Sequence, residues 1–221
     1  MRKDEFFAQW SALHGGAKIE GIVKAWLEIS FQSARALSKL RISPNFLTFF
    51  GVLASISLYL VLLDSPNSFL FALLLLALSL AADGIDGSLA ILSKKEGRAG
   101  ANLDALADRI SESFWALALY LIGGDYRLVL AAWLLSSIQE YIRARSAGLG
   151  LRDIGIVTIC ERPVRASLIA IALAALLFAD LLGSSGEIMT LSLATWIALI
   201  WSAMQAFSVV MLWKFIRKNI N

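Results

Sequence analysis

Cysteine, histidine and proline are scarce in this chain of 221 residues, which has one, one and three of them. A single cysteine cannot form an internal disulfide, and together with one histidine it cannot supply a Cys/His zinc site. Charged residues are also few, at 17%, whereas hydrophobic residues make up 58%, well above the roughly 45–50% of soluble domains. Mean hydropathy is +0.72. The composition therefore predicts an integral membrane protein held together by helix packing.

Two further absences narrow the class of protein. The N-terminal residues MRKDEFFAQWSAL contain no short apolar run followed by a small-residue cleavage site, so we expect no cleaved signal peptide. No apolar stretch alternates with polar residues as the strands of a membrane barrel do. Nothing in the sequence calls for a nucleic acid partner.

Long apolar runs occur six times, and each is close to the about 20 residues that cross a bilayer as a helix. We therefore predict an all-α integral membrane protein with six transmembrane helices. The predicted spans are Asn45–Leu63, Ser68–Leu92, Leu103–Ile122, Leu128–Ala147, Val164–Leu182 and Ile188–Trp213.

The segment before the first run is too charged to span a membrane. Its apolar residues Trp26, Ile29 and Leu37 recur at helical spacing among basic residues, which predicts an amphipathic juxtamembrane helix on the cytoplasmic surface. A soluble cap packed on the loops is the alternative. We expect two parts, residues 1–44 as tail and juxtamembrane helix and residues 45–221 as the membrane domain.

Basic residues mark alternate connections between the predicted spans. The intervening connections contain Arg127 as their only basic residue. By the positive-inside rule, both termini and the connection after the second span are cytoplasmic, in a multi-pass cell-membrane protein. The basic residues on that side are Lys94, Lys95, Arg98, Arg143, Arg145, Arg162, Arg165, Lys214, Arg217 and Lys218.

Four aspartates lie at the ends of two consecutive predicted spans. Asp83 and Asp86 are three residues apart, and Asp104 and Asp108 are four apart, so each pair shares one helix face. The short connection makes the two helices neighbours, and the pairs can face each other. Four carboxylates in a partly desolvated cleft would repel unless cations lay among them. Oxygen ligands suit Mg²⁺ or Mn²⁺, and four are enough for two ions that act on a phosphate.

Other uses of these acids stay open. They could line the ion pathway of a transporter, although clustering near one membrane face favours a site. Membrane prenyltransferases also use Asp-rich helices with Mg²⁺, but they have a second cluster that this chain lacks. Gly84 and Gly87 leave room for a substrate to touch the backbone, and Gly100 permits the turn into the third span. The acids could also pair with nearby cations, namely Lys94, Lys95, Arg98 and Arg109.

The same segment resembles the CDP-alcohol phosphotransferase family, whose pattern is D-x2-D-G-x2-A-R-x8-G-x3-D-x3-D. Ile91 stands where that pattern has arginine. SPNFLT at residues 43–48 is also similar to the family, and YIRARSAG at 141–148 with ERPVR at 161–165 resembles its inositol-phosphate-using branch. The matched positions are Asp83, Asp86, Gly87, Ala90, Gly100, Asp104 and Asp108.

This resemblance implies an enzyme of phospholipid biosynthesis that transfers a phosphatidyl group from CDP-diacylglycerol to an alcohol and releases CMP. Asp83, Asp86 and Asp104 would hold one metal ion, and Asp83, Asp104 and Asp108 the other, with Asp108 as general base. The implied donor-binding residues are Asn45, Thr48, Gly87, Lys94, Arg98 and Gly100.

Isoleucine at position 91 cannot neutralise a diphosphate as arginine would. Either Lys94, Lys95 or Arg98 takes over, or the chain is an altered paralogue that has kept its fold and lost its activity. Because all four metal ligands remain, we favour an active enzyme.

Four arginines near the fourth and fifth spans predict the acceptor. If these helices pack together, the guanidinium groups would form a cationic pocket beside the aspartates, fit for a phosphate. A phosphorylated alcohol is expected, inositol phosphate by the resemblance, with glycerol phosphate as the alternative. Binding of membrane lipid headgroups is the other use open to them. The arginines are Arg143, Arg145, Arg162 and Arg165. A homodimer is expected but has no pattern of its own.

Overall fold

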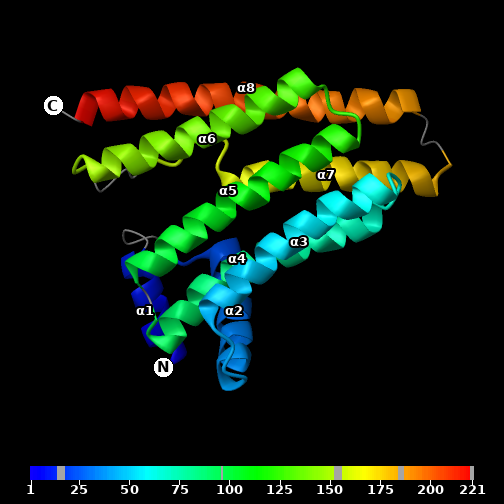
Figure 1. Cartoon of the computed structure of the whole chain (residues 1–221). Coiled ribbons are helices and arrows are strands. Elements are labelled where there is room, and N and C mark those ends of the chain that lie inside the picture. The colour runs from blue at the N-terminus through cyan, green and yellow to red at the C-terminus, as the bar shows by residue number, and fades with distance from the viewer. Residues whose placement is uncertain (14–17, 96, 152–155, 184–186, 220–221) are drawn as a thin grey trace. The chain divides into compact units, whose positions relative to one another are not determined.

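The computed structural model describes residues 1–13, 18–95, 97–151, 156–183 and 187–219. These residues form eight helices and no strand (Figure 1). Each of the six predicted apolar runs coincides with one of the last six helices, so the all-α prediction is confirmed. The helices are α1 Lys3–Leu13, α2 Gly21–Lys39, α3 Pro44–Asp64, α4 Phe69–Ser93, α5 Arg98–Leu121, α6 Tyr126–Gly148, α7 Arg162–Leu181 and α8 Glu187–Asn219.

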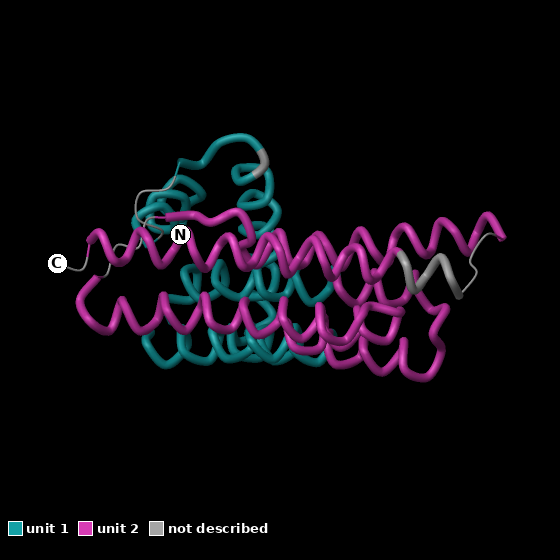
Figure 2. The backbone as a smooth tube through the Cα atoms, turned by 90° about the horizontal axis from the view of Figure 1, so that it is seen from above, with its two compact units in different colours: residues 1–54, 77–111 teal, residues 55–76, 112–221 magenta. Residues whose placement is uncertain are grey.

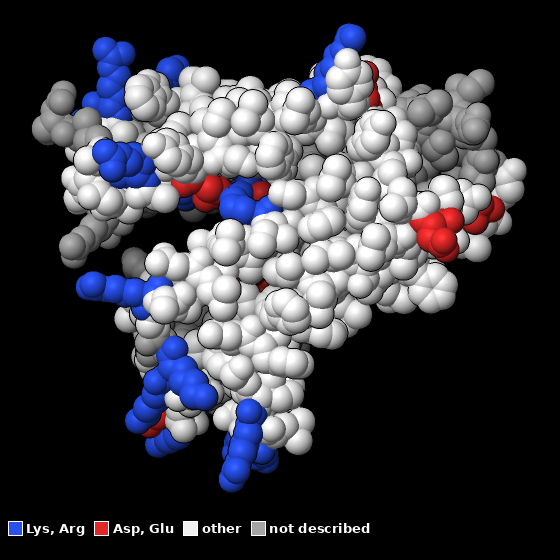
Figure 3. Space-filling model, in the orientation of Figure 1, with Lys and Arg blue, Asp and Glu red and all other residues white. Residues whose placement is uncertain are grey.

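Four helices are long and apolar enough to cross a membrane. They are α3, α4, α7 and the stretch Leu193–Asn219 of α8. Large apolar side chains on them face outward, such as Phe71 and Leu181, and most of the surface in Figure 3 carries neither Lys or Arg nor Asp or Glu. A surface of this kind suits lipid rather than water. The chain is a membrane protein.

Helices α5 and α6 have 24 and 23 residues and are therefore also long enough to span. They contain more charged residues than the four apolar helices, because α5 holds Asp104, Asp108 and Glu112 and α6 ends among arginines. The length of these two helices therefore favours a membrane span, whereas their charged residues disfavour one.

The short helix α1 was not predicted from the sequence. Asp4 and Glu5 lie in its first turn, where acidic side chains favour helix formation. Phe6 is fully buried, and its ring lies 5.2 Å from that of Phe31 on α2. Lys3 donates a hydrogen bond of 2.5 Å to Glu28 on α2 and lowers the pKa of that carboxyl. Helix α1 is therefore held against α2 by an aromatic contact and an ion pair.

The chain forms two compact units, drawn in two colours in Figure 2. Unit 1 comprises residues 1–54 and 77–111, and unit 2 comprises residues 55–76 and 112–221. In unit 1, the hydroxyl of Ser30 lies 2.9 Å from the carbonyl of Gly84 and 2.6 Å from the hydroxyl of Ser88. These buried contacts fix α2 to the part of α4 that holds Asp83.

Unit 2 has its own core, in which α6 packs along α8 and α7 contacts α8. Trp115 and Trp201 are fully buried there. A buried amide pair joins two of the helices, because Gln205 on α8 donates a hydrogen bond of 2.7 Å to the side-chain carbonyl of Gln139 on α6. The amide nitrogen of Gln139 lies 3.2 Å from the hydroxyl of Thr158.

Candidate active site

Three of the four aspartates meet in unit 1. Asp83 lies on α4, and Asp104 and Asp108 lie one turn apart on α5. One carboxylate oxygen from each lies within 4.8 Å of the other two. All three side chains are partly buried. Such a set of hard oxygen donors fits a divalent ion such as Mg²⁺ or Mn²⁺, since like charges this close together are stabilised by a cation.

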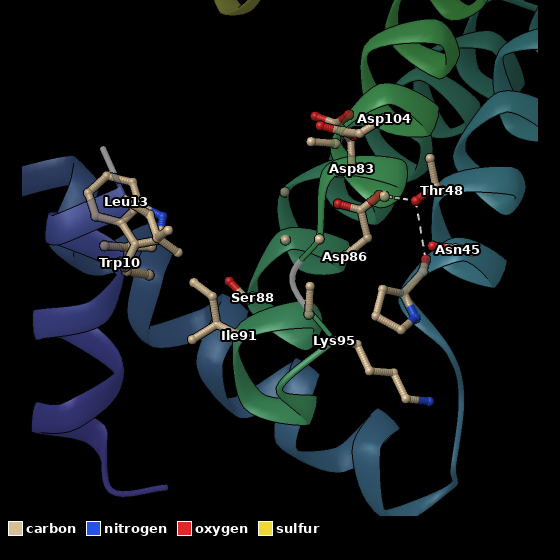
Figure 4. Close-up of a pocket in the computed structure, with 18 of the residues that line it drawn as sticks. Trp10, Leu13, Asn45, Thr48, Asp83, Asp86, Ser88, Ile91, Lys95 and Asp104 are labelled. Carbon is tan, nitrogen blue, oxygen red and sulfur yellow. Dashed lines mark hydrogen bonds between the residues drawn. The ribbon is translucent and has the colours of Figure 1, made fainter. Parts of the chain in front are cut away.

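Asp86 lies outside this trio. Its carboxylate is buried and accepts a hydrogen bond of 2.5 Å from the hydroxyl of Thr48 on α3, which is drawn as a dashed line in Figure 4. The Thr48 hydroxyl also lies 3.2 Å from the carbonyl of Pro44. The first turn of α3 therefore orients Asp86, and the side chain of Ser43 accepts a hydrogen bond from Phe46 in that same turn.

A cavity of about 430 Å³ opens beside the aspartates (Figure 4). It is lined by Asp83, Asp86 and Asp104 and by four of the predicted donor-binding residues, which are Asn45, Thr48, Gly87 and Gly100. No atom would contact a Cβ at Gly87 or Gly100 within 4 Å, so these positions leave the backbone accessible.

The end of α4 determines which of the following basic residues lines the cavity. Lys94 adopts a left-handed conformation with φ of 53°, and the amide of Lys95 then donates to the carbonyl of Ala90. Within the described part of the chain, Lys95 lines the cavity, whereas Lys94 and Arg98 do not. Of the three cations that the sequence offered for the diphosphate, Lys95 is therefore the one that lines the cavity.

The other wall of the cavity is apolar and was missed by the sequence patterns. Trp10 and Leu13 come from α1, Trp26 and Leu27 from α2, and Ile91 from α4. A signal existed, because an aromatic or apolar residue recurs every three or four positions between Phe6 and Leu13.

Ile91 is buried where the family pattern has arginine. Only 3% of its surface is exposed, and it packs in a cluster with Phe6, Leu27 and Phe31. An arginine here would place a charge inside this apolar cluster at considerable cost. The apolar side chain at position 91 therefore allows α1 to pack against α4 through Phe6.

Gly84 makes room for a side chain of the protein itself. A Cβ at this position would overlap the ring of Trp26 and lie 3.0 Å from its Cε2 and Nε1 atoms. Both glycines line the cavity, but the ring of Trp26 occupies the space of a Cβ at Gly84, whereas nothing lies within 4 Å of a Cβ at Gly87.

The four predicted acceptor arginines lie in unit 2 and do not all share the same partners. Arg165 is fully buried and pairs with Glu112 at 3.0 Å and Glu140 at 2.7 Å. Arg162 lies 3.9 Å from Glu112 and over the ring of Trp115 at 5.3 Å. Glu112 thus connects these two arginines.

Arg143 and Arg145 have other neighbours. Arg143 forms an ion pair with Glu161, which also accepts a hydrogen bond of 2.7 Å from the amide of Thr158. Arg145 is exposed and lines a groove with Trp213 and Arg217. The structure therefore does not gather all four arginines into one pocket.

Residues 41–213 match the family model for CDP-alcohol phosphatidyltransferase. The chain belongs to this family. The resemblance expected from the aspartate pattern is therefore confirmed, and the matched region includes all four aspartates and all four arginines.

Several curated members of the CDP-alcohol phosphatidyltransferase family are similar to the chain. It is 35% identical over 134 residues to archaetidylinositol phosphate synthase of Aeropyrum pernix, covering 59% of this chain and 68% of that protein. It is 33% identical over 151 residues to phosphatidylinositol phosphate synthase of Mycobacterium marinum, covering 64% and 62%. The matched stretches thus span roughly two thirds of these relatives.

The fold is also similar to solved members of the family. A crystal structure of Mycobacterium tuberculosis phosphatidylinositol phosphate synthase with CDP-DAG bound has a TM-score of 0.65 and 25% identity, and covers 84% of this chain and 94% of that one. Another structure of that enzyme, in complex with manganese and citrate, has a TM-score of 0.64 and 24% identity.

Proposed function

We propose that the protein transfers the phosphatidyl group of CDP-diacylglycerol to inositol phosphate and releases CMP. The observation that carries this proposal is the meeting of Asp83, Asp104 and Asp108 within 4.8 Å beside a cavity lined by Asn45 and Thr48. In the reaction, an acceptor oxygen bonds to the lipid-linked phosphorus while the bond from that phosphorus to the CMP oxygen breaks.

The four aspartates fit two divalent ions, Mg²⁺ or Mn²⁺. Asp83, Asp104 and Asp108 would hold one ion, and Asp83, Asp86 and Asp104 the other, with Thr48 fixing the Asp86 carboxylate. When bound, such ions neutralise phosphate charge and favour in-line displacement. The manganese complex of the Mycobacterium tuberculosis relative supports this choice of metal.

The remaining steps belong to the chain's own side chains. Asp108 would accept the proton of the attacking hydroxyl as the new O–P bond forms. The accessible backbone at Gly87 and Gly100 would let the cytidine diphosphate lie against the helices, with Asn45 and Thr48 as polar contacts. Positive charge would come from the loop after α4, with Lys95 nearest the ligand and Lys94 and Arg98 as outer cations.

The acceptor's phosphate would bind the arginines of unit 2. Arg165, Arg162 and Arg143 already meet glutamates, so an incoming phosphate would share these guanidinium groups with Glu112 and Glu161. The names of the curated relatives differ in the lipid part, archaetidyl or phosphatidyl, and agree on inositol phosphate. This agreement supports the acceptor more strongly than the lipid of the donor. Arg145, in its separate groove, would contribute less.

The membrane arrangement is part of the same proposal. Six spans, α3 to α8, would follow the amphipathic helix α2 on the cytoplasmic surface, with residues 1–44 as the juxtamembrane part and residues 45–221 as the membrane domain. The basic residues at alternate helix ends favour cytoplasmic termini and a cytoplasmic active site. We extend the proposal to a homodimer, which light scattering on the detergent-solubilised protein would check.

The decisive experiment is an acceptor panel with the purified protein, CDP-diacylglycerol and Mg²⁺ or Mn²⁺. CMP release with inositol phosphate, and much less with glycerol phosphate, inositol or serine, is the expected result. Release with glycerol phosphate instead would reassign the acceptor. No release with any alcohol, from protein that still binds CDP, would favour an altered paralogue.

A further inference from the structure

The cavity of unit 1 has two walls of opposite chemistry. One is formed by carboxylates and the Thr48 hydroxyl, and the other by two tryptophans with Leu13, Leu27 and Ile91. In Figure 4, Trp10 and Leu13 lie across the cavity from Asp83 and Asp104. A ligand that fills this space therefore meets carboxylate oxygens and aromatic rings.

Trp26 is held against the helix of the aspartate pattern. Its ring occupies the space that a side chain at Gly84 would need, one residue after Asp83. The ring lines the cavity and keeps 38% of its surface exposed. The absence of a side chain at Gly84 thus allows the ring of Trp26 to lie against α4.

Trp10 reaches the cavity because α1 is anchored at several points. Phe6 is fully buried against Phe31, and Ile91 packs in the same cluster. Lys3 and Glu28 add an ion pair between α1 and α2. Trp10 lies one turn after Phe6 on the helix, so docking of Phe6 directs Trp10 toward the cavity.

We propose that Trp10 and Trp26 form the binding surface for the base of the nucleotide donor, and that α1 is therefore part of the donor site. The inference rests on the proposed function, since a cytidine diphosphate has a diphosphate for the acidic wall and a planar base for the aromatic wall. Aromatic side chains bind bases through their faces, and loss of one such ring weakens binding by about tenfold or more. Ile91, at the usual arginine position, also contributes to this site. Its buried side chain belongs to the apolar cluster that holds α1 in place through Phe6.

The test is the affinity of the full-length purified protein for CDP with Mn²⁺, measured by calorimetry without any turnover. Trp10→Ala is expected to raise the Kd about tenfold. Trp10→Phe should restore most of the affinity, whereas Trp10→Leu, which keeps an apolar side chain but no ring, should not. Gln9→Ala, the adjacent position on α1, is the matched control and should bind as the parent does.

A second variant tests the position of the Trp26 ring against Gly84. Gly84→Ala pushes the ring away and should also raise the Kd for CDP, whereas Gly148→Ala, where nothing lies within 4 Å of the new Cβ, should not. Equal CDP affinity of the parent and Trp10→Ala overturns the inference and leaves the proposed function intact. The same holds if Trp10→Leu binds CDP like the parent, or if only binding of the lipid-linked donor is weakened. A parent protein that binds no CDP overturns both.

Discussion

Two groups of acidic residues, one in each unit, lie in contrasting surroundings. In unit 1, Asp83, Asp104 and Asp108 bring their carboxylates within 4.8 Å of one another. In unit 2, Glu112 lies 3.0 Å from Arg165 and 3.9 Å from Arg162. The first arrangement concentrates negative charge beside a cavity, and the second balances it inside the protein.

One helix carries both arrangements. Asp104, Asp108 and Glu112 follow each other at four-residue intervals along α5. The spacing of these three residues is the same, but the side chains around them differ. The surrounding side chains therefore determine what each carboxylate does. A carboxylate among carboxylates is suited to binding a cation, whereas a buried carboxylate against a guanidinium is suited to holding helices together.

The largest effect is expected from Asp104→Asn, which removes one member of the carboxylate trio. Turnover should fall at least about a hundredfold, because an amide is a poor ligand for a hard cation and phosphate charge is then less well neutralised. CMP release measures the loss, and an unchanged melting temperature shows that the fold persists. Asp64→Asn, at the exposed end of α3, is the control. Turnover within about tenfold of the parent would contradict the metal-binding role.

Glu112→Gln should have the opposite profile, with stability as its main readout. Removal of one partner of a buried ion pair costs about 3–5 kcal/mol, because the other charge is left buried. The melting temperature in detergent should therefore fall by several degrees, and Arg165→Met should lower it as well. The exposed Glu5→Gln is the control. If Glu112→Gln melts like the parent while Asp104→Asn unfolds, the contrast between the units is wrong.

The two adjacent lysines after α4 allow a similar comparison between neighbouring residues of the same charge. Lys95 lines the cavity and Lys94 does not, so Lys95→Ala should weaken binding of CDP about tenfold, as expected for loss of a charge-assisted contact to phosphate. Lys94→Ala removes the same charge from the same loop and should change the Kd less than about twofold. Similar losses for both variants would show that only the loop's total charge matters.

The smallest effect concerns Cys160, a neutral buried group of unit 2. Burial raises the pKa of its thiol to about 11. Because the thiolate is the reactive form, the folded protein should not react with maleimide at neutral pH, and reaction should begin only as the pH approaches that value. Mass spectrometry measures the modification, and detergent-denatured protein is the positive control. Rapid labelling of the folded protein would show that the site opens.

The sequence predicted those features that depend on spacing along one helix. Apolar runs located the helices α3 to α8, and the four-residue interval placed Asp104 and Asp108 on one face with Asp83 opposite. The pattern also identified the family. These features are local, because a helix sets the direction of its side chains over short intervals.

Features that depend on contacts between distant segments were not predicted. Three such features join residues far apart in the chain. They are the burial of Ile91 against α1, the contact of Trp26 with Gly84, and the ion pair of Arg165 with Glu112. The sequence offered Lys94, Lys95 and Arg98 as alternatives and could not choose among them, because the left-handed turn at Lys94 decides which lysine lines the cavity. The count of six spans stays a prediction, because four of the described helices meet the criteria of length and apolar composition for a span and the charged helices α5 and α6 do not.

The amide pair between Gln139 and Gln205 has a consequence for the order in which the protein is made. Gln139 lies in α6, and its side-chain carbonyl accepts the hydrogen bond from Gln205 in α8. During synthesis α6 leaves the ribosome well before α8, so the carbonyl must stay hydrated or borrow another donor until the last helix arrives. Because an unsatisfied amide is costly in hydrocarbon, α6 should settle into its final position only after α8 has been inserted. Insertion of α8 thus completes the packing of α6.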